Sequence, residues 1–479
     1  MTTPPLDTAQ LHARLATVVG ADHVSAVPSG ACYGGLLGAH LSADLHPRAV
    51  VRPASAEQLQ RLAPMIAELG HGLWSSGNAT GNGAQRGHPR KAGVLVDLGR
   101  MNRIIDVDRR GAFAVIEAGV TYAELAAHVR ERDLPLWLDA DTNGAHTVAG
   151  SIASRYTGLT PYGDHQAAVC GIEAVLANGA LLRTGMGALP GSDCGARYKY
   201  GFGPALDGLF SRAHFGVVTR LGLWLMPAPR KFMPFALALP DLASMARTID
   251  RLQPLMLDGG LGGHVLIAAH SSDAALLARL GNDAGRSSGA PPWTLYGALY
   301  GVPEMVEHHG QRLALALDSA PAAGQGAAWD ARLRQLRGEA LYNDADGHDA
   351  CALSFTLLAP ASGADVQALH HAVLTRLAEF APRLSVQLAR RYLTLTVELP
   401  DESVADGDAA GAALAAIKDL LGAGYGLHSS SPALAAELTA RHTPAGLRHL
   451  YDGLHTALDP YAMLATRGKF TPDKARRKR

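Results

Sequence analysis

The sequence lacks net charge, long apolar runs and closely spaced cysteines. Its 43 lysines and arginines balance 43 aspartates and glutamates, so we expect no broad surface for nucleic acid or anionic membrane. No apolar run reaches the roughly 18 residues of a membrane-spanning helix. Residues 1–7 have neither the basic region nor the apolar core of a secretory signal. These absences predict a cytoplasmic protein that binds neither nucleic acid nor membrane.

The four cysteines, at positions 32, 170, 194 and 351, never form a CxxC pair. This spacing gives little support to a zinc or iron–sulfur site, so no metal is predicted. Free thiols in the core or in loops are the simpler interpretation.

The 479 residues and the apolar content of 48% favour a globular protein of two domains. A helix is expected over 8–19, strands over 94–98 and 114–118, and a helix over 121–131. Ser55 and Gln58 form a capping-box pattern before a further helix, which Pro64 should kink or restrict and Gly70 should end.

From about Lys231 strands and helices alternate. The expected strands are 235–239, 264–270, 293–300, 352–358 and 384–399, and the expected helices are 243–255, 305–317, 365–379 and 410–421. This order predicts two β-α-β repeats around an antiparallel sheet, with a flexible loop at 321–326. Beyond Pro444 the chain should return to the first domain, and the basic tail 474–479 should be solvated.

Ser76–Gly83 contains three glycines with small polar residues between them. Backbone N–H groups of such a loop can converge on an anion, and a pyrophosphate is the natural guest. A plain surface turn explains this loop alone about as well. The loop is neither a G-x-G-x-x-G turn that opens a helix nor a Walker A motif.

The block from Thr160 to Gly187 is more informative. Thr160–His165 reads Thr-Pro-Tyr-Gly-Asp-His, and an apolar strand over 171–177 follows. Asn178 and Gly179 then predict a hairpin with a type I′ turn, in which both residues take positive φ.

Together with other ordered motifs, this block resembles the FAD domain of the vanillyl-alcohol oxidase and 4-cresol dehydrogenase family. The other motifs are Val120–Tyr122, Tyr200–Pro204, Asp207–Phe210, Trp224–Pro227, Asp459-Pro460 and Gly468-Lys469. The resemblance implies an α+β fold. A PCMH-type FAD-binding domain of two subdomains would span 1–230, an antiparallel-sheet cap of ferredoxin-like repeats 231–440, and a C-terminal return to the FAD domain 441–479.

FAD is the cofactor that this resemblance implies. The expected cofactor-binding residues are Ser76, Gly77, Asn78, Ala79, Thr80, Gly81, Asn82, Thr147, Gly150, Ser151, Ala153, Tyr162, Gly163, Asp164, Gly171, Gly216, Val217, Val218, Arg467 and Lys469. Arg467 departs from the family pattern, which has a proline before Gly-Lys.

The groups with which the family binds a phenolate are missing. Asn82 and Leu159 stand where tyrosines are usual, and a Tyr-Arg pair near the C-terminus is replaced by the stretch around His428. A buried phenolate without donors is costly. The resemblance therefore predicts a substrate other than a para-alkylphenol, with Leu159, Thr142 and Arg391 near it.

The catalytic aspartate of the family falls on Thr142 by gapless counting, and Asp141 is adjacent. Asp141 is the first candidate for the acid–base role, Asp139 is a further one, and a loop or capping carboxylate is the alternative. His428 is a second candidate base, unless it is a surface histidine.

Family members can tether FAD through a His or Tyr on a cap strand, and that site falls near Tyr392. Tyr392, Thr394 and Thr396 should share one strand face, opposite the apolar positions 393, 395 and 397. An ordinary half-buried tyrosine with untethered FAD is the alternative. Arg390 and Arg391 are either anion ligands or a solvated pair.

The resemblance predicts an FAD-linked oxidase or dehydrogenase of specialised metabolism. It would move hydride from an alcohol, amine or activated C–H bond of a small molecule to flavin N5. Oxygen or an unknown carrier would accept the electrons, and a homodimer is a candidate assembly. The alternatives are a non-redox flavoprotein that catalyses cyclisation or elimination, and a catalytically silent partner subunit.

Overall fold

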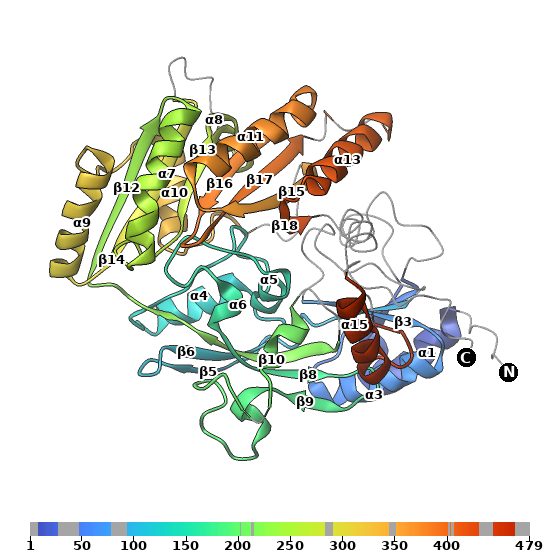
Figure 1. Cartoon of the computed structure of the whole chain (residues 1–479). Helices are drawn as coiled ribbons and strands as arrows, with labels where there is room; N and C mark the ends of the chain where they lie inside the picture. The colour runs from blue at the N-terminus through green and yellow to red at the C-terminus, as the bar shows by residue number, and fades with distance from the viewer. Residues whose placement is uncertain are drawn as a thin grey trace.

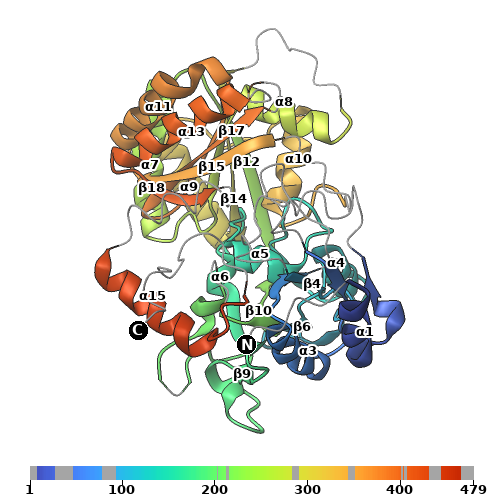
Figure 2. The ribbon, with the colours of Figure 1, turned by 90° about the vertical axis from the view of Figure 1, so that its right-hand side faces the viewer.

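The computed structural model describes residues 8–26, 47–77, 93–201, 203–211, 215–282, 291–343, 351–400, 403, 407–430 and 444–464. The fold is α+β. An N-terminal domain with two sheets occupies the lower half of Figure 1, and a larger antiparallel sheet with its helices occupies the upper half. The view turned by 90° shows the same two layers (Figure 2).

The first subdomain is a small sheet covered by helices. Its elements are α1 (Thr8–Val19), η1 (Ala21–His23), β1 (Val24–Ser25), β2 (Ala49–Val51), α3 (Ala56–Glu68), β3 (Gly72–Ser76) and β4 (Gly93–Asp97). The strand order is β1-β2-β4-β3, in which β4 runs parallel to both β2 and β3. Leucines of α1 and α3 pack on the valines of β4. The predicted helices and strand are confirmed, and α3 continues past Pro64 to end before Gly70.

The second subdomain is an antiparallel sheet with the order β5-β6-β10-β8-β9. Its elements are β5 (Ile104–Asp108), β6 (Phe113–Glu117), α4 (Tyr122–Glu131), α5 (Val148–Ser154), α6 (His165–Ala168), β8 (Val169–Val175), β9 (Leu181–Arg183), η4 (Gly185–Ala188), η5 (Asp207–Phe210) and β10 (Val217–Trp224). Thr121 and Glu124 form a complete capping box at the start of α4. A short pair of β7 (Leu136–Trp137) and β11 (Met226–Pro227) leads to the second domain.

The hairpin of β8 and β9 is confirmed, but its predicted type I′ turn is wrong. Only Gly179 has a positive φ, of 82°, and Asn178 does not. Leu176 O accepts from Gly179 N at 2.9 Å, and Leu176 N donates to Ala180 O at 2.9 Å. The loop is thus longer than two residues, with a single left-handed glycine after the turn.

The cap is one antiparallel sheet with the order β12-β14-β13-β16-β17-β15-β18. Its strands are β12 (Lys231–Leu239), β13 (Val265–Ala269), β14 (Trp293–Gly301), β15 (Cys351–Pro360), β16 (Arg383–Leu388), β17 (Tyr392–Pro400) and β18 (Gly426–Ser430). Its helices are α7 (Leu242–Leu257), α8 (His270–Arg279), α9 (Pro303–Leu317), α10 (Gly326–Leu336), α11 (Gly363–Leu377), η6 (Ala378–Phe380) and α13 (Gly407–Gly422).

The two halves of the cap confirm the predicted ferredoxin-like repeats to different extents. In the second half, β15, α11, β16, β17, α13 and β18 follow the full β-α-β-β-α-β order. The first half has β12, α7, β13 and β14 in the same relative arrangement, without a fourth strand among the residues described. The single strand expected over 384–399 is wrong, because residues 389–391 turn the chain between β16 and β17.

The two faces of the cap sheet differ as the alternation predicts. Leu393, Leu395 and Val397 belong to the core that α7 and α11 cover. On the other face Leu266 and its neighbours pack against Leu159 of the first domain. The cap therefore presents a side-chain surface directly to the Thr160–His165 region.

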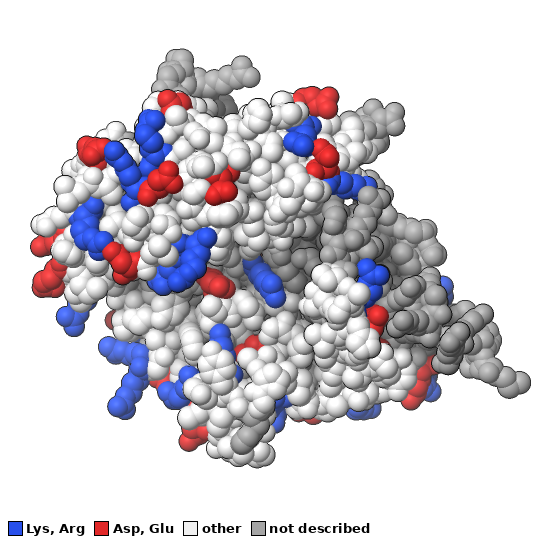
Figure 3. Space-filling view, viewed as in Figure 1, with Lys and Arg blue, Asp and Glu red and all other residues white. Residues whose placement is uncertain are grey.

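The C-terminal helix α15 (Ala445–Leu458) packs on the first domain (Figure 2). Phe215 stacks on Tyr451, and Leu73 N donates to Met463 O at 2.7 Å. These contacts hold residues 445–463 against the first domain. Within the described ranges no helix is both long and apolar enough to cross a membrane. Acidic and basic side chains are interspersed on the face shown in Figure 3.

Candidate active site

The end of β3 lies against the start of α5. A Cβ added to Gly77 would be 2.1 Å from the Thr147 hydroxyl oxygen, so only glycine permits this approach. Thr147 caps α5, and its hydroxyl accepts from Gly150 N at 3.2 Å. The rest of the predicted loop, Asn78, Ala79, Thr80, Gly81 and Asn82, lies outside the described residues, as do Arg467 and Lys469.

Two further backbone segments, residues 118–120 and the start of β10, lie near the contact between β3 and α5. Val148 N donates to Val120 O at 3.0 Å, and Ala118 N donates to Thr219 O at 3.0 Å. The segment 118–120 thus contacts both β10, which begins after Gly216 with Val217 and Val218, and the start of α5, which carries Ser151 and Ala153. Small residues close-packed at the carboxyl end of a parallel strand fit the pyrophosphate and ribose of a dinucleotide. The residues present therefore fit FAD.

Two other predicted cofactor residues shape loops. Gly163 closes a tight loop, because a Cβ there would be 2.5 Å from Gly158 O. Asp164, two residues after Tyr162, caps α6 and accepts from Ala167 N at 3.0 Å. Gly171, in contrast, faces the excursion after β9, where a Cβ would be 2.4 Å from Gly195 O. Its position is explained by packing there.

A buried carboxylate–imidazole pair lies at the centre of the candidate site. Asp139 Oδ1 is 2.9 Å from His165 Nε2, and both side chains are 3% exposed. Asp139 Oδ2 accepts from Thr160 N at 2.8 Å. On its other side, His165 Nδ1 lies 2.9 Å from the Tyr122 hydroxyl and 3.3 Å from Ser151 Oγ. The pair thus ties α4 and α5 to the Thr160–His165 loop.

A second pair lies two residues further along. Asp141 Oδ2 is 3.0 Å from His146 Nδ1. Thr142 follows, with its hydroxyl 3.0 Å from the Tyr156 hydroxyl, and it accepts from Gln335 Nε2 at 3.3 Å. Burial, reinforced by the charge of Asp141, holds the pKa of Tyr156 far above its ordinary value. Tyr156 is therefore a neutral hydrogen-bonding group.

A cavity of about 120 Å³ lies between the first domain and the cap, and Tyr156 is one of its lining residues. Asp139, Tyr156, Thr157 and Leu159 come from the first domain, and Leu266, Arg332, Gln335 and Gln387 come from the cap. Gln387 Nε2 donates to Gly158 O at 2.7 Å, and Gln387 Oε1 accepts from the Thr157 hydroxyl at 3.1 Å. The walls are mostly polar. They suit a small molecule that carries hydrogen-bonding groups.

The remaining predicted residues lie at the edge of the cap. Tyr392 begins β17 and is half-buried, and burial, followed by the charge of Asp164, raises its pKa. This places its phenol near the Thr160–His165 loop. Arg391 is exposed in the turn before β17, and Arg390 is exposed as well. His428 is half-buried on the edge strand β18.

Sequence reasoning missed three residues of this site. Gln387 and Gln335 lie in the cap, 229 and 193 residues from the groups that they contact. Tyr156 lies four residues before the Thr160–His165 block, and His165 is part of that block. The partner of His165, Asp139, is known only from the buried contact between them in the structure. No signal in the sequence predicts this contact.

Comparison with known proteins shows which families and proteins this chain resembles. Residues 47–185 match the FAD binding domain family. The chain is 35% identical over 280 residues to the 4-cresol dehydrogenase [hydroxylating] flavoprotein subunit of Pseudomonas putida, which is 54% of this chain and 53% of that protein. It is also 35% identical over 215 residues to 1'-carboxy-chondrochloren decarboxylase of Chondromyces crocatus, which is 44% of this chain and 39% of that protein. The chain thus matches about half the length of these relatives, or less.

A solved structure extends the likeness to the cap. The crystal structure of p-cresol methylhydroxylase with substrate bound has a TM-score of 0.84 and 25% identity, covering 96% of each chain. The fold, the cradle and the matched domain define an FAD-binding flavoprotein. The chain is similar, in both domains, to the PCMH-type, vanillyl-alcohol oxidase family of FAD-linked oxidoreductases, and its cofactor is FAD.

Proposed function

We propose that this protein oxidises an alcohol, an amine or an activated C–H bond of a small, polar organic molecule. FAD, when bound, supplies the acceptor for a hydride. The observation that carries the proposal is the polar cavity between the cap and the first domain, with Tyr156 and Gln387 in its walls. Such groups orient a substrate that carries hydroxyl or amine groups, and the cap excludes bulk water from it.

Asp141 is the base that this arrangement supports best. Its side chain is 12% exposed, and His146 is its partner among the described residues. Its charge reaches Tyr156 in the cavity wall. Asp139, in contrast, has both oxygens engaged by His165 and Thr160. A carboxylate with one oxygen not engaged by described groups is better placed to take a proton than a fully engaged one.

The test is anaerobic mixing of the FAD-loaded protein with a panel of alcohols, amines and para-alkylphenols, followed through the visible flavin bands. We expect bleaching by an alcohol or amine and none by the para-alkylphenols. Asp141→Asn should keep FAD and bleach about 10²–10⁴-fold more slowly, the usual contribution of a general base. Product formation with the flavin oxidised throughout would replace this proposal with non-redox chemistry. A protein that binds no FAD would be a silent subunit.

Decarboxylation is a second candidate, favoured by the 35% identity to the Chondromyces crocatus decarboxylase. Measuring carbon dioxide release from carboxylated members of the same panel separates the two. The Pseudomonas putida relative is named as a flavoprotein subunit, so we include a partner subunit beside oxygen among the electron acceptors to be tested.

A further inference from the structure

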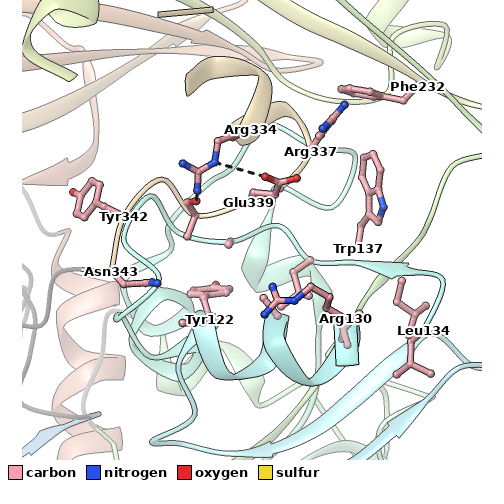
Figure 4. A pocket seen from close by; sticks show the side chains of 18 residues that line it. Tyr122, Arg130, Leu134, Trp137, Phe232, Arg334, Arg337, Glu339, Tyr342 and Asn343 are labelled. Atoms are coloured by element: carbon pink, nitrogen blue, oxygen red, sulfur yellow. Dashed lines mark hydrogen bonds and ion pairs between the residues drawn. The ribbon is translucent and has the colours of Figure 1, made fainter. Parts of the chain in front are cut away.

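A second and larger cleft lies between the domains. Its volume is about 810 Å³, within the range of small-molecule sites. One wall is formed by α4 and β7 of the first domain. The facing wall is formed by Phe232 of β12, by Arg334 in the last turn of α10, and by residues between 337 and 343 that follow this helix (Figure 4). Ligand sites occur preferentially at such domain interfaces.

The charges in this cleft do not balance. Arg130, Arg334 and Arg337 line it, and Glu339 is the acidic residue among its lining groups. Glu339 pairs with Arg334 at 3.6 Å, and the Arg334 guanidinium also donates to Leu341 O at 3.0 Å. Arg130 and Arg337 form no ion pair within the described part of the chain. Two guanidinium groups on facing walls are therefore left for an anion.

An aromatic surface lies beside these guanidinium groups. The Arg337 guanidinium carbon is 5.6 Å from the centre of the Phe232 ring. The Trp137 ring meets Phe232 edge-on, with centres 5.6 Å apart. Figure 4 shows Trp137 and Phe232 at one end of the cleft, next to Arg337 and on the same side as Arg130. A flat apolar ligand can pack on Trp137 while its charged end meets a guanidinium.

We propose that this cleft binds a small aromatic carboxylate. A guanidinium offers two parallel N–H donors that match the two oxygens of a carboxylate, and the tryptophan offers a rigid face for a ring. The ligand would contact both domains. It would also lie beside Tyr122, which lines the cleft and whose hydroxyl is 2.9 Å from His165 Nδ1. The proposal does not depend on the oxidation proposed above.

The probe is 2-naphthoate, titrated into the full-length, FAD-loaded protein by isothermal calorimetry. We expect one site whose Kd rises about tenfold in Arg130→Ala and in Arg337→Ala, as loss of a charge-assisted hydrogen bond predicts. Arg337→Lys should fall between Arg337→Ala and the unchanged protein, because it keeps the charge and loses the fork. The neutral amide of the same ring should bind about tenfold more weakly. Arg109→Ala, in an exposed turn that does not line the cleft, is the matched control and should bind normally.

The visible flavin spectrum distinguishes this cleft from the flavin-side cavity. Saturation with 2-naphthoate should leave the flavin bands unchanged. Binding that shifts these bands and is unaffected by Arg130→Ala and Arg337→Ala would put the ligand in the smaller cavity and overturn the proposal. Equal affinity for the acid and its amide, or no binding, would also overturn it. Thermal melting of each variant shows that it is folded before it is titrated.

Discussion

Two carboxylate–imidazole pairs stand two residues apart in the sequence but in different surroundings. In the Asp139–His165 pair each side chain is 3% exposed, whereas in the Asp141–His146 pair the exposures are 12% and 25%. Breaking a buried pair costs about 3–5 kcal/mol, because the remaining group loses its partner without gaining water. A pair that water reaches contributes about 0–1 kcal/mol.

The difference extends to the partners of each carboxylate. Asp139 is engaged by His165 and by Thr160 N, and His165 in turn reaches Tyr122. Asp141 has one described partner, His146. The same two residue types therefore hold the domain together in one pair and leave a carboxylate available for proton transfer in the other. Exposure and partner number, rather than residue type, separate the two roles.

The largest expected effect is the loss of the buried pair. Asp139→Asn removes the charge that faces His165, and we expect the free energy of unfolding to fall by about 3 kcal/mol. Asp141→Asn should lower it by less than about 1 kcal/mol, because water can replace the lost contact. Urea unfolding followed by circular dichroism, with FAD bound, measures both. Equal losses in the two variants would show that the two pairs do not differ in role.

A smaller effect is expected from crowding the buried pair while keeping its residues. A Cβ on Gly158 would lie 1.5 Å from Asp139 Oδ1, so Gly158→Ala must push the carboxylate away from His165. Such overpacking costs about 1–3 kcal/mol. The matched control is Gly262→Ala, whose Cβ would meet only Pro161 Cγ at 3.8 Å. If Gly158→Ala melts with the control, the carboxylate is not held as tightly as its burial indicates.

The sequence predicted the fold of the FAD domain better than it predicted the side-chain contacts of the candidate site. The motifs from Val120 to Pro227 indicate the FAD domain because their order and local hydrogen bonds are properties of short segments. The Asp139–His165 contact spans 26 residues, and the contact of Gln387 with Gly158 spans 229. Such pairs depend on how whole elements pack, and a single sequence carries no record of that.

The errors within elements have local causes. Residues 389–391 turn the chain without glycine, proline or asparagine, so 384–399 has the composition of one long strand. The helix α10 was not predicted. It begins at Gly326, directly after a segment whose glycines and prolines indicate a loop. In the hairpin after β8, Asn178-Gly179 marks the turn correctly. The turn type was predicted wrongly because a type I′ turn needs positive φ at both residues, and only Gly179 has it.

The smallest expected effect concerns Tyr392, which lies near a third carboxylate, Asp164. Burial and the charge of Asp164 raise the pKa of Tyr392, so its phenol stays neutral beyond its ordinary range and is a poor nucleophile at neutral pH. We therefore expect untethered FAD: after acid precipitation the flavin colour should appear in the supernatant, and Tyr392→Phe should leave this unchanged. Tyr425→Phe, a tyrosine packed on the helix-covered core, is the control. Colour that stays in the wild-type pellet and is released only by Tyr392→Phe would show a tether, and would mean that the bound cofactor reverses the effect of burial and of Asp164 on the pKa of this phenol.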